Sequence, residues 1–186
     1  MSRVEDLVRK YASYVSLPWD AHLSGGERVW FVVYDKADER RLRARRDEFE
    51  VETKRAKHDW VLIDLTNAFA EWMAAHPYRE SYFGAPDDLD MELATFKEEV
   101  CRRLQAAFAG AADPDNTVFA VLGVAGLFGF ARCWEIIESV KTVIRGKLLV
   151  FFPGQHESGN YRLLDARDGP SYMAVPITAD PGGIAE

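Results

Sequence analysis

A run of three evenly spaced glycines is the first feature of this sequence that could do chemistry. Gly123, Gly126 and Gly129 lie between a strand-like and a helix-like segment, where backbone amides often bind a phosphate. The spacing is GxxGxxG, however, whereas the dinucleotide fingerprint is GxGxxG, and no Gly-Lys-Ser/Thr follows. Two interpretations stay open. The run is either a phosphate or nucleotide site, with Arg132 holding the anion, or a tight turn that requires glycine.

Two aspartates stand where predicted strands end. Asp35 follows the segment 29–34, and Asp64 lies near the end of the segment 60–65. In an open parallel sheet, ligands bind at the edge formed by the carboxyl ends of the strands. Two carboxylates at that edge could hold Mg²⁺. Each could instead cap the helix that follows, and the absence of a DxD spacing favours capping.

The remaining reactive side chains are scattered. The four histidines form no HxH or HxxxH pair, the two cysteines form no CxxC pair, and no GxSxG motif occurs. We therefore expect no catalytic residue, no metal and no cofactor. Two isolated thiols, the lack of an apolar signal-peptide core and the lack of an apolar stretch of about 20 residues predict a cytoplasmic protein with no membrane contact.

The basic side chains are concentrated in residues 36–58. At about 100° per residue the arginines there spread around a helix and form no single stripe. The whole chain has a net charge of −7 and a pI near 5.2, so direct nucleic-acid binding is not expected. Arg41 and Arg45 can pair with Glu48 and Glu52 on a solvated helix, and docking on an acidic protein partner stays open.

Aromatic residues are abundant, with five Trp, seven Tyr and eleven Phe, and several fall in predicted loops. Exposed aromatics with few charges around them mark protein interfaces, although aromatics in loops also cover the ends of a core. Together with two arginines they form the predicted partner interface: Trp19, Arg41, Arg45, Tyr78, Tyr82, Phe83 and Tyr161.

Strand-like and helix-like segments alternate along the chain, which predicts a parallel sheet flanked by helices. Four predominantly apolar runs are typical of strands buried on both faces: 29–34, 60–65, 117–122 and 147–152. Helices are expected over 4–15, 38–57, 67–76, 91–109 and 128–144. The predicted fold is an α/β, Rossmann-like three-layer sandwich with a mostly parallel sheet and helices on both faces.

The connecting and C-terminal segments carry further predictions. Residues 78–90 are expected to be irregular, and Pro153-Gly154 is expected to end the fourth strand. Residues 161–166 and 172–177 predict a C-terminal strand pair joined at 168–171, and the sequence does not decide whether this pair joins the main sheet. At 186 residues the chain fits one α/β domain over 1–178, with a flexible tail over 179–186.

Six sequence blocks together resemble a known family. They follow one another in its order and spacing: Phe31–Asp35, Asp64–Thr66, Gly123–Phe128, Leu149–Gly154, Asn160–Leu164 and Tyr172–Ile177. Over about Val4–Ile177 the chain resembles BrxB, a small component of the BREX (bacteriophage exclusion) defence systems.

The resemblance implies a cytosolic antiviral protein without established catalytic residues. BREX systems combine such a protein with a PglZ-type, alkaline-phosphatase-like protein, a large ATPase and an adenine methyltransferase. The resemblance therefore predicts a non-catalytic adaptor that binds PglZ or the ATPase. The alternative from the residues alone is a nucleotide- or phosphate-binding enzyme or sensor that uses the 123–129 turn with Asp35 and Asp64.

Overall fold

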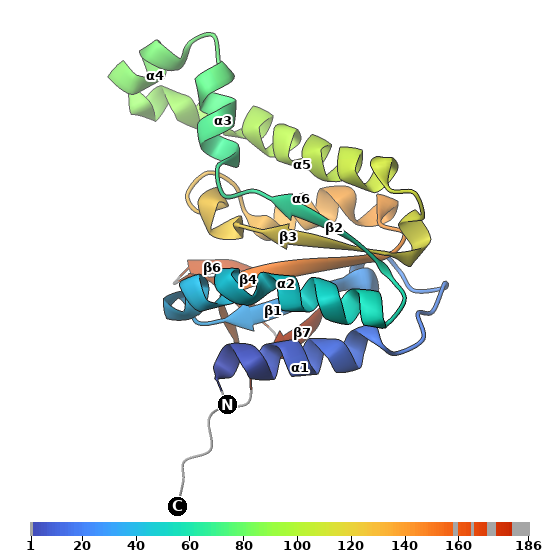
Figure 1. The fold of residues 1–186 in the computed structure, drawn as a ribbon. Coiled ribbons are helices and arrows are strands. Elements are labelled where there is room, and N and C mark those ends of the chain that lie inside the picture. Colours follow the sequence, from blue (N-terminus) through green and yellow to red (C-terminus); the bar gives the residue numbers. More distant parts are fainter. Residues whose placement is uncertain (1, 158–159, 165, 171–173, 180–186) are drawn as a thin grey trace, which may run out of the picture.

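A mostly parallel sheet forms the centre of the molecule. The computed structural model describes residues 2–157, 160–164, 166–170 and 174–179. Five strands run parallel in the order β2-β3-β4-β1-β7 (Figure 1). Their bounds are β1 Val29–Tyr34, β2 Asp59–Asp64, β3 Thr117–Leu122, β4 Lys147–Glu157 and β7 Val175–Thr178. An antiparallel pair, β5 Asn160–Leu163 and β6 Ala166–Pro170, continues from the far half of β4.

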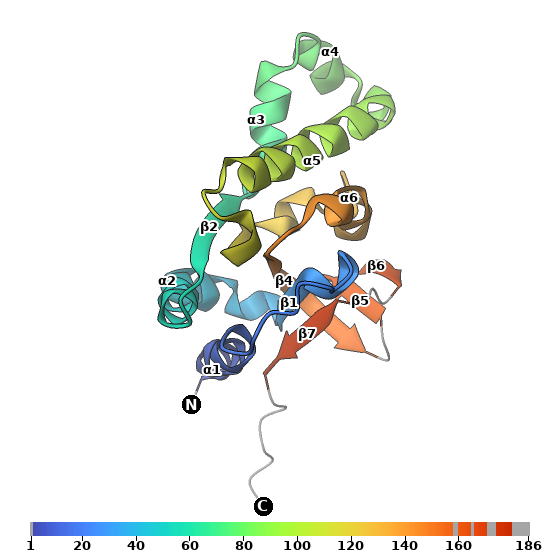
Figure 2. The same cartoon turned by 90° about the vertical axis from the view of Figure 1, so that its right-hand side faces the viewer.

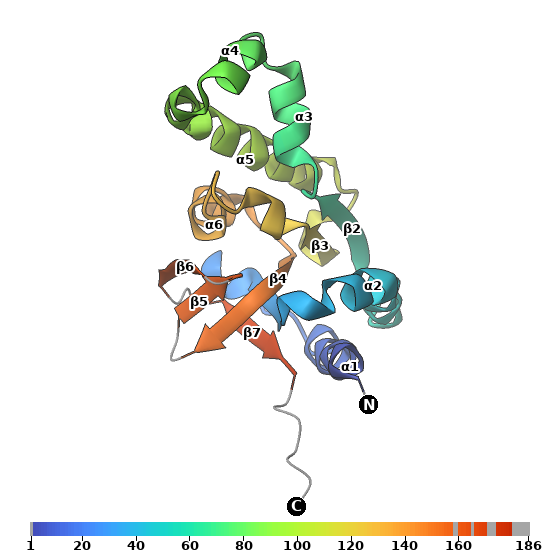
Figure 3. The same cartoon turned by 90° about the vertical axis from the view of Figure 1, so that its left-hand side faces the viewer.

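Helices cover both faces of this sheet, which confirms the predicted Rossmann-like sandwich. One face carries α1 Arg3–Val15 and α2 Glu39–Arg55, and the other carries α5 Leu93–Gly110 and α6 Cys133–Val140 (Figure 2). Two shorter helices, α3 Ala68–Ala75 and α4 Arg79–Gly84, project beyond the sheet at the top of Figure 3.

The strand sequences explain the two cores. Every residue of β1 and β3 is buried, as their predominantly apolar sequences predict. Because side chains alternate across a strand, Phe31 and Phe119 pack under α5 and α6, whereas Trp30 and Val32 pack under α1 and α2. Between α1 and α2, the buried hydroxyls of Tyr11 and Thr53 form a hydrogen bond of 2.5 Å.

Strand β2 departs from the prediction of a strand buried on both faces. It is the edge strand next to β3, and each of its six residues is half-buried or exposed. Its apolar sequence, Trp60 to Ile63, matches that of a central strand, so composition alone does not distinguish the two positions. The edge position follows from the connection through α2, which carries the chain from β1 past β4 and β3.

Three connections also differ from the predictions. Residues 78–90 contain α4 and most of a 3-10 helix, Pro86–Glu92, and are not irregular. Strand β4 continues through Pro153-Gly154, because its partner changes there from β1 to β5. Helix α6 begins at Cys133 rather than at residue 128, because a 3-10 turn, Val124–Leu127, follows β3.

The C-terminal strands resolve a question that the sequence left open. The predicted turn at 168–171 is wrong over 168–170, which belong to β6, and β6 pairs with β5. Strand β7 joins the main sheet beside β1. Thus β5 and β6 form the antiparallel pair, and the last strand completes the parallel sheet. The predicted flexible tail over 179–186 lies outside the described residues except for Ala179.

Candidate functional site

The carboxyl edge of the sheet holds both predicted ligand aspartates, but far apart. Asp35 follows β1 and Asp64 ends β2, and β4 and β3 lie between these two strands. Three strand spacings separate the two positions, which is about 14 Å. Carboxylates that share one cation both lie within about 2.6 Å of it. The fold therefore does not bring Asp35 and Asp64 together around a single Mg²⁺.

Asp35 acts as a cap. Its carboxylate accepts a hydrogen bond of 2.8 Å from the backbone amide of Ala37, at the start of a 3-10 turn. The residue also lines a pocket of about 370 Å³ at the ends of β1, β4 and β7, together with Arg3, Asp38 and His156. The chain leaves β1 toward α2 on one face and leaves β4 toward β5 on the other, so this pocket lies at the topological switch point of the sheet.

Asp64 closes a turn at the end of β2. Its carboxylate accepts hydrogen bonds from the Thr66 amide, at 2.9 Å, and from the Thr66 hydroxyl. Partial burial acts to raise the pKa of Asp64, but the Thr66 hydrogen bonds and the nearby charges of Arg43 and Arg46 outweigh it and lower the pKa below its ordinary value. Neither aspartate caps an α-helix as predicted, because α2 begins after Asp38 and α3 begins after Asn67. Asp35 caps a 3-10 turn and Asp64 closes a turn with Thr66, so both carboxylates have a local role without a ligand.

The turn role of Asp64 leads to a testable pH dependence. Asp64→Ala should lower the free energy of unfolding by about 1 kcal/mol at neutral pH, the usual cost of losing a capping carboxylate. Because the folded-state pKa is lowered, this contribution is complete above pH of about 4 and is lost as pH falls below that value. Urea unfolding of the native chain and of the variant, at neutral pH and below pH of about 4, measures the difference in the free energy of unfolding.

Asp59→Ala is the matched control, since Asp59 is an exposed aspartate at the opposite end of β2. It should change the free energy of unfolding by less than about 0.5 kcal/mol at either pH. A loss on Asp64→Ala that stays constant between neutral and acidic pH would contradict the assignment of the carboxylate as the stabilising group.

The glycine run 123–129 forms a tight turn, and the loop after β2 packs directly against it. Gly123 has a positive φ of 83°, and a Cβ there would lie 2.8 Å from Thr66 Cα. A Cβ on Gly126 would lie 2.9 Å from the Thr66 carbonyl oxygen. The loop after β2 thus occupies the space where a phosphate would sit.

Two amides of this turn donate hydrogen bonds within the turn itself. The Gly126 amide donates to the Gly123 carbonyl at 2.9 Å, and the Phe128 amide donates to the Ala125 carbonyl at 3.1 Å. Val124 and Leu127 are buried in the core. These contacts agree with the tight-turn interpretation, because the amides of Gly126 and Phe128 already donate within the turn and not to a phosphate.

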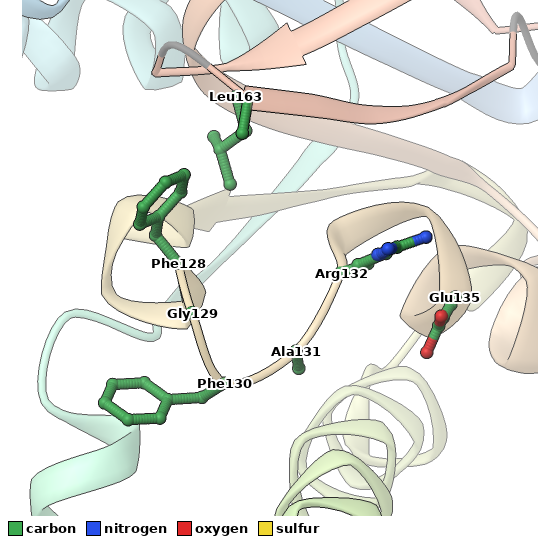
Figure 4. Close-up of a pocket in the computed structure, with 8 residues that line it drawn as sticks. Phe128, Gly129, Phe130, Ala131, Arg132, Glu135 and Leu163 are labelled. Carbon is green, nitrogen blue, oxygen red and sulfur yellow. The ribbon is translucent and has the colours of Figure 1, made fainter.

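Arg132 lies at the start of α6, beside a pocket formed with the turn that precedes this helix. This pocket has a volume of about 410 Å³, and Figure 4 shows Phe128 and Phe130 along one side and Arg132 and Glu135 along the other. Glu135 already contacts Lys97 Nζ at 3.3 Å. Arg132 is exposed and forms no ion pair within the part of the chain that the structure describes.

Two predicted interface residues belong instead to the core or its ends. Tyr161 is fully buried in β5, with its ring 4.5 Å from that of Phe31, so its predicted role at an interface is wrong. Trp19 is half-buried and stacks on His58, with ring centroids 3.7 Å apart. The alternative, that loop aromatics cover the ends of the core, describes both of them.

The two interface arginines are engaged by carboxylates of this chain. Arg41 pairs with Asp38 at 3.0 Å, not with Glu48 or Glu52 as the spacing predicted. Arg45 pairs with Glu48 at 2.6 Å, as predicted, and also with Glu5 of α1 at 2.7 Å. Arg45 therefore links α1 to α2, and these pairs make both arginines poor candidates for a docking surface.

The aromatics of the projecting helices remain available. Tyr78 is 66% exposed and Phe83 65% exposed, whereas Tyr82 is half-buried against His76. The sequence analysis missed Met91, which is 86% exposed. Met91 falls at the first position of the predicted helix 91–109, but the structure places it in the 3-10 helix before α5. Tyr78, Phe83 and Met91 are called the docking patch below.

No group of three or more His, Cys, Asp or Glu side chains in the described ranges is arranged to hold a metal ion. In the same ranges, every helix is too short or too polar to cross a membrane. Comparison of the chain with family models, with curated proteins and with solved structures gives no match.

Proposed function

We propose that this protein is a non-catalytic adaptor of a BREX-type antiphage defence system and acts in the cytoplasm. Its partner is the PglZ-type protein, with the large ATPase as a second candidate and the methyltransferase as a third. The resemblance of the sequence to BrxB names these partners, and the docking patch is the observation that carries the binding role.

The docking patch has the composition of a protein interface. Aromatic residues and methionine are enriched at interfaces, and they lose water most favourably when a partner covers them. All three patch residues are exposed and lie within 14 residues of chain, Tyr78 and Phe83 at α4 and Met91 in the 3-10 helix that follows it. Helix α4 projects beyond the sheet, where a partner can reach it (Figure 1).

Charge further defines the partner surface. Five carboxylates and one arginine lie between residues 78 and 92, so the docking patch has an acidic surround. An apolar partner surface bordered by Lys and Arg would complement it and would be steered toward it. The same acidic surround disfavours nucleic acid, and the arginines of α2 that could attract it are largely paired with carboxylates of this chain.

The alternative function, nucleotide or phosphate binding at the 123–129 turn, has less support. Thr66 packs against the turn, and the amides of Gly126 and Phe128 are bonded within the turn. Two strands, β3 and β4, lie between the strands that carry Asp35 and Asp64. A Mg²⁺-dependent thermal shift with a nucleotide, abolished by Asp64→Ala in a variant that still folds, would restore this alternative.

The experiment that tests the adaptor function is a pull-down of the tagged protein from cells that express its neighbouring genes. We expect a stoichiometric PglZ-type or ATPase band, identified by mass. The adaptor function would be overturned if neither protein is retained under conditions in which both are expressed.

A further inference from the structure

A buried lysine without a charged partner lies at the amino edge of the sheet, opposite the edge where the aspartates lie. Lys147 is the first residue of β4 and is only 4% exposed. Its Nζ forms no ion pair or hydrogen bond with any described residue. Lysine is almost never this buried unless it is paired, because an isolated buried charge is costly.

Lys147 lines a pocket whose walls include aromatic side chains. The pocket has a volume of about 330 Å³ and is lined by Tyr14, Trp19, Trp30, Glu27 and Lys147, among others. Nζ lies 5.1 Å from the ring centroid of Trp30 and 5.9 Å from that of Trp19. These aromatic faces stabilise the ammonium group but accept no hydrogen bond of ordinary strength from it.

Trp19, which also lines this pocket, carries a second donor without an acceptor. Its Nε1 atom is buried and has no hydrogen-bond partner among the described residues. Buried polar groups in proteins are hydrogen-bonded in the great majority of cases, so two donors without acceptors in one pocket call for an explanation. A ligand with acceptor oxygens would satisfy both.

The carboxylates at the rim of the pocket are held by their own loop. Asp20 accepts a hydrogen bond from the His22 amide at 2.8 Å, and Glu27 accepts one from the Ser24 amide at 2.8 Å. Neither lies within ion-pair distance of Lys147. Burial, with the nearby Arg28 charge, lowers the pKa of Lys147, and these rim carboxylates offset only part of that effect.

We propose that this pocket binds a small aromatic or apolar carboxylate. The carboxylate accepts hydrogen bonds from Lys147 Nζ and Trp19 Nε1, and the apolar body of the ligand packs against Trp19, Trp30 and Tyr14. A volume of about 330 Å³ suits a ligand with one or two rings. The site is independent of the docking patch and of the proposed adaptor function.

Phenylacetate and its uncharged analogue phenylacetamide test the proposal by NMR titration of the isotope-labelled full chain. The indole N–H resonance of Trp19, assigned from Trp19→Phe, should move with phenylacetate at millimolar concentration. Phenylacetamide should bind about tenfold more weakly or not at all, because hydrogen bonds to charged groups contribute that much.

Lys147→Met keeps the length and burial of the side chain and removes the charge, and Lys141→Met is its control on the surface. Lys147→Met should weaken phenylacetate binding by about tenfold or more, whereas Lys141→Met should leave it unchanged. The proposal is overturned if phenylacetate fails to bind the native chain, if the amide binds equally well, or if the two methionine variants bind alike. Lys147→Met removes a buried charge, so its folding is not expected to fail.

Discussion

Gly123→Ala is expected to lower the free energy of unfolding by about 3 kcal/mol or more. Two costs combine at this position. Alanine at the positive φ of 83° costs about 1–2 kcal/mol, because its Cβ approaches the backbone carbonyl. The same Cβ meets the backbone of Thr66, which cannot rotate away as a side chain would, and overpacking costs a further 1–3 kcal/mol or so.

Gly129→Ala is the matched control for this prediction. Gly129 also has a positive φ, of 85°, but a Cβ there would meet nothing within 4 Å. It should therefore cost only the strain of about 1–2 kcal/mol. Urea unfolding of both variants measures the difference, which is the cost of displacing the loop after β2. Equal losses would show that Thr66 moves aside freely, and the space beside Gly123 would then be open to a ligand.

The sequence predicts the sheet well where strand composition reflects burial. The predominantly apolar runs of β1 and β3 do correspond to strands buried on both faces. The same reasoning fails at β2, whose apolar residues stand at an edge, because strand order depends on the crossover connections and not on composition. The prediction that a helix begins at residue 128 also fails, because a turn precedes α6. This turn requires Gly123 to lie against Thr66, which is 57 positions earlier in the sequence.

The candidate site residues divide in the same way, into those set by the local sequence and those set by contacts between distant segments. The local roles of Asp35, which caps a 3-10 turn, and of Asp64, which closes a turn with Thr66, involve residues within two positions in the sequence. The burial of Tyr161 and the cluster of Trp19, Trp30 and Lys147 arise only when distant segments meet. No pattern around Lys147 in the sequence distinguishes it from an exposed lysine that begins a strand.

The largest effect on binding is expected from the docking patch. Truncating both Tyr78 and Phe83 to alanine should weaken binding of the PglZ-type partner by about 30-fold or more. One central aromatic residue of an interface commonly contributes 2 kcal/mol or more, which alone is about 30-fold, and both side chains are exposed in the free protein. Isothermal titration calorimetry with the purified partner measures the loss.

The fold should tolerate these truncations. Substitutions of exposed side chains usually change the free energy of unfolding by less than about 0.5 kcal/mol, and Tyr78 and Phe83 belong to neither hydrophobic core. Tyr78 is the N-cap residue of α4, but its side chain makes no capping hydrogen bond. A loss of binding would therefore report the interface and not a loss of structure. Thermal unfolding of the variant, run beside the calorimetry, checks this separation.

Val51→Ala is the matched control on another surface. Val51 is 46% exposed on α2, on the opposite side of the sheet from the projecting helices (Figure 1). If the partner docks on the patch, Val51→Ala leaves its affinity unchanged, and added salt slows association because the acidic surround no longer steers the partner. If the double variant instead binds as tightly as the native chain while Val51→Ala binds weakly, the partner docks on the helices of the other face. The charged α2 would then be the docking surface, and its paired arginines would have to exchange their internal carboxylates for those of the partner.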